Sequence, residues 1–190
     1  MVWETVAVGR HIMMTAAYWT LHPVDAARPG LPRQTGRIRH HTSADFNGVP
    51  DLVRLIRECS SLPTSRLALE FLILTAARTK EVLEATWAEV DEAKNLWVLP
   101  PERTKTGLIH RVPLTKRMEE ILREARDLSN GSQLIFASPA TGRPLSYNTL
   151  LHVLQKRVGS TATVHGFRSS FKDWASEITT FPNEVSEMAL

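Results

Sequence analysis

The sequence predicts a mainly α-helical domain with a small antiparallel β-sheet, which is an α+β fold. Helical hydrophobic periodicity recurs in several segments after residue 46. Strand character is confined to short segments, 96–99, 109–114 and 134–136, and the first two flank a turn that contains Gly107. With 190 residues, 43% of them hydrophobic and 23% charged, the chain can bury a substantial core.

Helices account for most of the first half of this domain. Residues 50–58 should form a helix with a proline in its first turn, where the missing N–H costs nothing. Residues 64–75 should form a second helix, so rich in apolar side chains that nearly all of it is expected to be buried. A third, short helix is predicted for residues 79–87, before the strands begin.

The second half is again mostly helical. Thr115 is a good N-cap for a helix that runs to about residue 128. After the short strand at 134–136, Ser146 starts a helix to about residue 158. Two more helices are expected, one over 165–178 and a last one that begins near Pro182.

The basic residues are clustered, although the net charge is only +3 and the pI is about 9.3. One cluster spans residues 28–41 and the other spans 103–117. Such clusters would suit a nucleic-acid backbone, but a solvated surface explains them too, and charge alone favours that explanation. The first cluster falls within residues 25–45, where prolines and glycines without apolar periodicity predict a linker.

Several classes of protein are excluded. Cys59 is the only cysteine, so no intrachain disulfide can form, which fits a reducing compartment. The longest apolar run, 67–77, is too short to span a bilayer, and no secretory signal is present. No spacing of histidine and cysteine fits a zinc site, and no phosphate-binding loop or dinucleotide fingerprint occurs. We therefore expect a cytoplasmic protein that needs no metal or other cofactor.

Arg78 stands at a corner between two predicted helices, three residues before Glu81. An arginine at such a corner can offer two parallel donors to a phosphate and stays charged at physiological pH. Glu81 could hold the guanidinium in place. The alternative is a structural Arg–Glu pair that joins two helices, and the local sequence favours this alternative.

Two further positions suit phosphate chemistry. Lys105 lies at the predicted hairpin turn, where it could donate a proton, although most lysines in turns are simply solvated. His165 and Arg168 are one helical turn apart at a predicted helix start, where free N–H groups favour anions. Gly166 would let the backbone come close to a ligand there. A capping histidine and a surface arginine are an equally good reading.

Together these segments resemble the catalytic domain of tyrosine recombinases, the phage-integrase family. Residues 75–82 with Trp87 are similar to the family pattern Thr-Gly-x-Arg-x-x-Glu, and residues 103–115 resemble its lysine-bearing β-hairpin. Residues 164–175 resemble its His-x-x-Arg box. The likeness runs from about Phe46 to Leu190 and is strongest to integrases of prophages and genomic islands. It implies the fold of the DNA breaking-rejoining enzymes.

The resemblance also implies roles for the site residues. Arg78 and Arg168 would clamp the scissile phosphate of duplex DNA, with Glu81 in support. Lys105 would protonate the leaving 5′ oxygen, and His165 would assist proton transfer. The family acts through a 3′-phosphotyrosyl intermediate and recombines DNA as a tetramer, so we expect a homo-oligomer on attachment-site DNA and no membrane partner. The candidate DNA contacts outside the catalytic set are Arg39, Arg103, Arg111 and Arg143.

Two departures from the family pattern qualify these expectations. The family's nucleophilic tyrosine would come after Leu190, and neither Tyr18 nor Tyr147 occupies its place, so no nucleophile is assigned within the chain. Residues 1–24 could be the end of a core-binding domain, and residues 46–190 an incomplete catalytic domain. We therefore expect a fragment that does not cleave DNA alone. The alternatives are a non-catalytic DNA-binding remnant and a helical interaction module.

Overall fold

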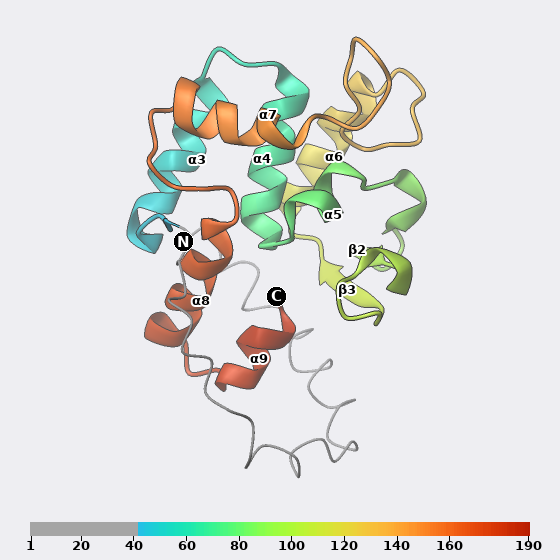
Figure 1. The fold of residues 1–190 in the computed structure, drawn as a ribbon. Coiled ribbons are helices and arrows are strands. Elements are labelled where there is room, and N and C mark those ends of the chain that lie inside the picture. Colours follow the sequence, from blue (N-terminus) through green and yellow to red (C-terminus); the bar gives the residue numbers. More distant parts are fainter. Residues whose placement is uncertain (1–41) are drawn as a thin grey trace.

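The computed structural model describes residues 42–190 (Figure 1). Its first helices, α3 (Val49–Glu58) and α4 (Pro63–Thr75), each have a proline in the first turn, as the sequence predicted. The possible remnant 1–24, most of the predicted linker and Arg39 lie outside the described residues.

The central element is α4, because eleven of its thirteen residues are buried. It packs against α3, α5, α6 and α7, and Figure 1 shows it between α3 and α6. Phe71 on α4 contacts two aromatic rings, with centroid distances of 5.2 Å to Trp97 and 5.5 Å to Phe136. These contacts join α4 to the sheet and fix the place of its C-terminal end, where the candidate site lies.

The third helix, α5 (Thr79–Leu83), is shorter than predicted. The prediction carried it to Trp87, but the chain leaves the helix after Leu83 and a 3-10 turn covers Trp87–Glu89. The reason is tertiary, because the backbone around Thr86 pairs with residues 133–135 through an isolated bridge to Leu134. Backbone hydrogen bonds to another segment therefore replace the last helical turn.

The sheet has three antiparallel strands in the order β1 (Val90–Asp91), β2 (Leu96–Leu99) and β3 (His110–Pro113). β2 and β3 are the predicted pair, with Leu99 opposite His110. The sequence did not predict β1, because a strand of two residues is too short to show an alternation of apolar and polar side chains. The predicted strand at 134–136 is wrong: only Leu134 forms a bridge, and residues 135–136 are a buried turn.

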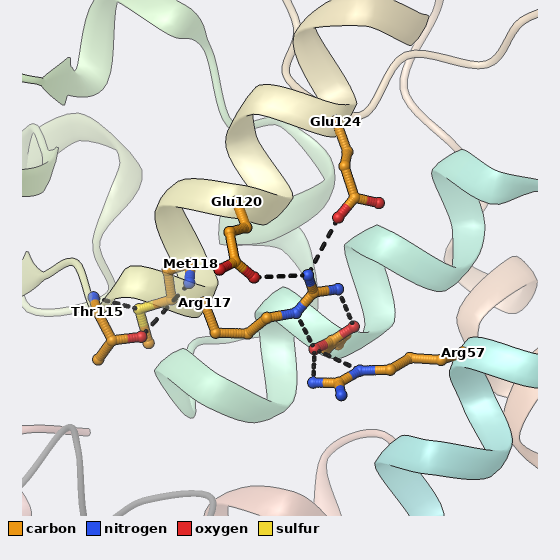
Figure 2. Close-up of polar contacts among 7 residues, drawn as sticks. Arg57, Thr115, Arg117, Met118, Glu120 and Glu124 are labelled. Carbon is orange, nitrogen blue, oxygen red and sulfur yellow. Dashed lines mark hydrogen bonds and ion pairs between the residues drawn. The ribbon is translucent and has the colours of Figure 1, made fainter.

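Helix α6 (Lys116–Leu128) follows the sheet directly. Thr115 caps it as predicted, because its hydroxyl accepts a hydrogen bond from the Met118 N–H at 3.4 Å (Figure 2). One face of the helix is buried against the core. The buried side chains of that face are Met118, Ile121, Leu122 and Ala125.

A buried carboxylate connects three helices. Arg57 of α3 and Arg117 of α6 both donate hydrogen bonds to the carboxylate of Glu70 on α4, which is 1% exposed. Figure 2 shows the two arginines turned toward each other from their helices. Burial raises the pKa of Glu70, but hydrogen bonds from Arg117 and Arg57 outweigh it and lower this pKa. Arg117 also contacts Glu120 and Glu124 at the surface, each at 3.0 Å. This cluster stabilises the packing of α4.

The C-terminal part consists of α7 (Tyr147–His152), a π-helical turn (Val153–Arg157), α8 (Gly166–Ile178) and α9 (Asn183–Met188). α8 and α9 pack against each other (Figure 1). The predicted helices at 146–158, at 165–178 and after Pro182 are thus confirmed, within a residue or two. None of the helices in residues 42–190 is both long and apolar enough to cross a membrane.

Candidate active site

Arg78 is the N-cap of α5, directly after a left-handed turn at Ala76 (φ 49°) that ends α4. The Glu81 carboxylate accepts two hydrogen bonds from it, 2.8 Å from the backbone N–H and 2.9 Å from Nη1. Glu81 is buried, whereas the Arg78 side chain is 33% exposed. The guanidinium is therefore fixed at one edge and open to solvent at another.

Arg168 reaches the same corner from the first turn of α8. Its Nη1 donates a 2.8 Å hydrogen bond to the Ala76 carbonyl, and its Nη2 donates to the backbone oxygen of Leu190. Burial, with the positive charge of Arg78 as the next cause, lowers the pKa of Arg168 to about 10. Arg78 and Arg168 repel each other, whereas Glu81 and Glu187 attract Arg168, and an anion bound beside the two guanidinium groups would relieve their mutual repulsion.

The other two predicted catalytic residues lie on neighbouring segments. His165 immediately precedes α8, is exposed, and accepts a 3.2 Å hydrogen bond from the Arg168 N–H with its carbonyl. Lys105 is exposed in the ten-residue connection between β2 and β3, in a turn that ends at Gly107 (φ 68°). The structure thus brings Arg78 and Arg168 together, with His165 in the same turn as Arg168 and Lys105 on a solvent-exposed turn.

The start of this connection is tied to α5 by Arg103. Its Nη2 donates a 2.6 Å hydrogen bond to the Glu81 carbonyl, and its Nη1 forms an ion pair with the buried Glu89. The Arg103 side chain is only 17% exposed, so most of it serves to hold the connection in place. Arg111 and Arg143 are exposed. Direct contact of these arginines with DNA stays a prediction.

Gly166 is close to a different partner from the one predicted. A Cβ at this position would lie 2.3 Å from the Thr42 carbonyl oxygen and 2.9 Å from the Ser43 Cα. The backbone that approaches the start of α8 is therefore the chain's own segment 42–44. Hydrogen bonds from Thr163 to Thr42 and from Ser170 to the Ala44 carbonyl hold this segment there.

Sequence reasoning did not single out His110 as a candidate site residue. It begins β3 and is half-buried, and burial lowers the pKa of its imidazole. Glu81 opposes this shift, whereas Arg168 and Arg78 add to it, so the ring lies within electrostatic reach of all three. The sequence could have indicated this, because side chains alternate between the two faces of a strand and His110 therefore lies on the same face as the apolar Val112.

Comparison with known proteins agrees with the fold. The family model described as "Phage integrase family" matches residues 45–181. This chain belongs to the phage integrase family. Residues 42–190 have the fold of a tyrosine-recombinase catalytic domain, as the sequence resemblance implied.

One curated relative of this integrase-family chain is the prophage integrase IntA of Escherichia coli K12. It is 31% identical over 144 residues, which cover 75% of this chain and 35% of the relative. A lambda integrase dimer bound to a COC′ core site has a similar fold, with a TM-score of 0.58 and 21% identity over 80% of this chain and 60% of the other. A lambda integrase tetramer bound to a Holliday junction is also similar, with a TM-score of 0.57 and 21% identity. That match covers 79% of this chain and 44% of the other.

Proposed function

We propose that this chain takes part in site-specific recombination of double-stranded DNA and supplies the phosphate-binding part of a tyrosine-recombinase active site. The observation that carries the proposal is the convergence of Arg78 and Arg168 from segments 90 residues apart on one corner, where the buried Glu81 carboxylate holds Arg78 and the Ala76 carbonyl holds Arg168. A phosphodiester is the anion that two such guanidinium groups fit, because each can donate two parallel hydrogen bonds.

Each site residue has a role in this proposal. Arg78 and Arg168 bind the non-bridging oxygens of the scissile phosphate and stabilise the charge that develops in the transition state. Glu81 orients Arg78 through the two hydrogen bonds described above. His165 assists proton transfer at the phosphate. Lys105 gives its proton to the 5′ oxygen as that oxygen leaves.

The nucleophile in this proposal is a tyrosine hydroxyl, as throughout the family. Its oxygen attacks the phosphorus, the bond to the 5′ oxygen breaks, and a 3′-phosphotyrosyl link forms. The reverse attack by a 5′ hydroxyl rejoins the strands. The energy of the phosphodiester bond is conserved in the link, so the reaction requires neither ATP nor a metal ion. Tyr18 and Tyr147 are not assigned to this role.

The proposed partner is duplex DNA that carries an attachment site, and the proposed compartment is the cytoplasm. Residues 46–190 would be the catalytic domain, preceded by a basic linker at 25–45 and by the end of a core-binding domain at 1–24. A homotetramer on DNA is proposed from the lambda integrase tetramer on a Holliday junction. The chain spans 35% of the length of IntA, and recombination is proposed for a protein of that full length.

Duplex binding tests the proposal directly. Fluorescence anisotropy of a labelled duplex should show binding by residues 1–190 that weakens steeply between 50 and 200 mM salt, because arginine and lysine contacts release counterions. Arg78→Ala and Arg168→Ala should each weaken binding about tenfold or more, as expected for loss of a charged hydrogen-bond donor.

Arg54→Ala is the matched control, since Arg54 is an exposed arginine on α3 that pairs only with Asp51 among the described residues. It removes the same charge and should change affinity by less than about twofold. Circular dichroism checks that all variants are folded. Salt-independent binding, or equal loss in all three variants, would count against the proposal and favour a helical interaction module.

A further inference from the structure

The side chain of His110 faces the inside of the domain. Successive residues of a strand point to opposite faces, so His110 shares a face with Val112, which is 5% exposed, while Arg111 between them is exposed. The cross-strand partner of His110 is Leu99, which is fully buried, and Val112 pairs with the fully buried Trp97. The imidazole therefore stands at the end of the core-facing side of the sheet.

This end of the sheet lies against the corner that holds the two arginines. The hydrogen bond from Arg103 to the Glu81 carbonyl ties the β2–β3 connection to α5, and His110 is where that connection returns to the sheet. The charged groups that act on the imidazole are Glu81 and Arg78 from α5 and its cap, and Arg168 from α8. Its pairing partner on β2 is the apolar Leu99.

If this half-buried histidine were purely structural, its ring N–H would be expected to donate a hydrogen bond to an acceptor in the protein. Among residues 42–190 the His110 imidazole has no hydrogen bond, although it is half-buried beside three charged groups. The unpaired ring nitrogens of His110 are not among the buried side-chain atoms of residues 42–190 that lack a hydrogen-bond partner, so they are accessible to solvent. An imidazole N–H that has no acceptor in the protein can donate a hydrogen bond to an anion that the two guanidinium groups attract.

We propose that His110 is a further phosphate-contacting residue of this site, whose imidazole N–H donates a hydrogen bond to a non-bridging oxygen of the phosphate between Arg78 and Arg168. This inference rests on the proposed function, since it requires a phosphodiester at the two arginines. It gives β3 a direct part in substrate binding, beside the lysine-bearing connection that leads into it. Without DNA, burial first, and then the positive charges of Arg168 and Arg78, lower the pKa of the ring, and a bound phosphate would offset those two charges.

The proposal predicts coupling between protonation and DNA binding. A bound phosphate favours the protonated imidazole, so duplex binding should take up a proton at His110 and strengthen as the pH falls. NMR of the chain with labelled histidine rings can follow this directly, with the His110 signal assigned from the His110→Gln spectrum. We expect the pKa of His110 to lie below 6.5 in the free chain and to rise by about one unit or more on saturation with duplex.

Two substitutions separate contact from packing. His110→Ala should weaken duplex binding about tenfold at pH 6, as for a lost hydrogen bond to a charged group. His110→Gln keeps an N–H donor without a titrating group, so it should restore much of the affinity and remove the part of the pH dependence that His110 supplies. His152→Gln is the matched control, because His152 is an exposed histidine on α7, and it should change neither quantity.

The outcomes distinguish this inference from the function on which it rests. If the wild-type chain binds no duplex at all, the proposed function fails. If the chain binds duplex through Arg78 and Arg168 but the His110 signal does not respond to saturating duplex, only the role of His110 is overturned. The NMR measurement uses the wild-type chain, so it decides the question even if His110→Ala does not fold.

Discussion

Arg168 and Ala76 are 92 positions apart in the sequence, yet the Arg168 guanidinium donates a 2.8 Å hydrogen bond to the Ala76 carbonyl. This bond links the start of α8 to the turn that ends α4. A hydrogen bond from a charged group contributes about 1.5 to 3 kcal/mol, so the turn at Ala76 helps to place Arg168. The position of Arg168 therefore depends on the backbone conformation at Ala76, two residues before Arg78.

Ala76→Gly should stabilise the domain. Ala76 has φ 49°, a left-handed conformation that costs an ordinary residue about 1 to 2 kcal/mol, whereas glycine adopts it freely. After the entropy that glycine loses on folding, we expect a gain of about 0.5 to 1 kcal/mol. Thermal unfolding measures it. Ala77→Gly is the control, because Ala77 has no positive φ, and it should destabilise; the same sign for both would refute the argument.

Gly166→Ala should destabilise the domain and weaken duplex binding. The new methyl group would lie 2.3 Å from the Thr42 carbonyl oxygen, so either the 42–44 segment or the first turn of α8 must shift. Such overpacking costs about 1 to 3 kcal/mol. Because Arg168 is on the same turn, affinity for a labelled duplex should fall too. Gly48→Ala meets no atom within 4 Å, so it should change neither stability nor affinity appreciably.

Glu70→Gln should be strongly destabilising. It leaves the guanidinium groups of Arg57 and Arg117 without their shared buried carboxylate. Loss of one partner of a buried ion pair costs about 3 to 5 kcal/mol, and the partial exposure of both arginines reduces this to about 2 to 3. Urea unfolding gives the value. Glu124→Gln removes a half-exposed carboxylate from the same Arg117 and should cost less than about 0.5 kcal/mol; similar losses would contradict the argument.

The free energy of unfolding should decrease as the pH drops below about 6.5, because His110 has a lowered pKa in the folded chain. The unfolded chain binds a proton at the ordinary value of 6.5, whereas the folded chain resists it, so protonation favours unfolding as the pH drops. Between pH 6.5 and 5, His110→Gln should show a flatter profile of unfolding free energy than the wild type. Glu70 does not interfere, since its lowered pKa affects stability only below about 4.5. Parallel profiles would show that His110 does not titrate as proposed.

Residues 1–190 should bind duplex without forming a covalent adduct. Tyr147 is the first residue of α7, which packs on α4 and α5, and it is 63% exposed. Among residues 42–190 no hydrogen bond holds its hydroxyl in place, whereas the reaction needs a hydroxyl held in line with the leaving oxygen. A denaturing gel with labelled nicked duplex tests this. An adduct that disappears in Tyr147→Phe would identify Tyr147 as the nucleophile.

The sequence predicted well those elements whose signal is local. The helices α3, α4, α6 and α8 were placed within a residue or two, because hydrophobic periodicity, prolines and the Thr115 cap all act within a few residues. The last turn of the helix predicted at 79–87 and the strand predicted at 134–136 were wrong, because Thr86 and Leu134 pair with each other. Their backbone hydrogen bonds depend on a contact about fifty residues away, which no local pattern contains.

The sequence by itself determined the family, the α+β class and the residue types at the corner, since the order and spacing of Arg78, Lys105, His165 and Arg168 are properties of the chain. Only the tertiary structure decided that Arg168 binds the Ala76 carbonyl, that the 42–44 segment covers Gly166, and that the charges of both arginines act on His110. Electrostatic and packing interactions act through space, so a neighbour distant in sequence sets the charge, the pKa and the accessible volume at each of these positions.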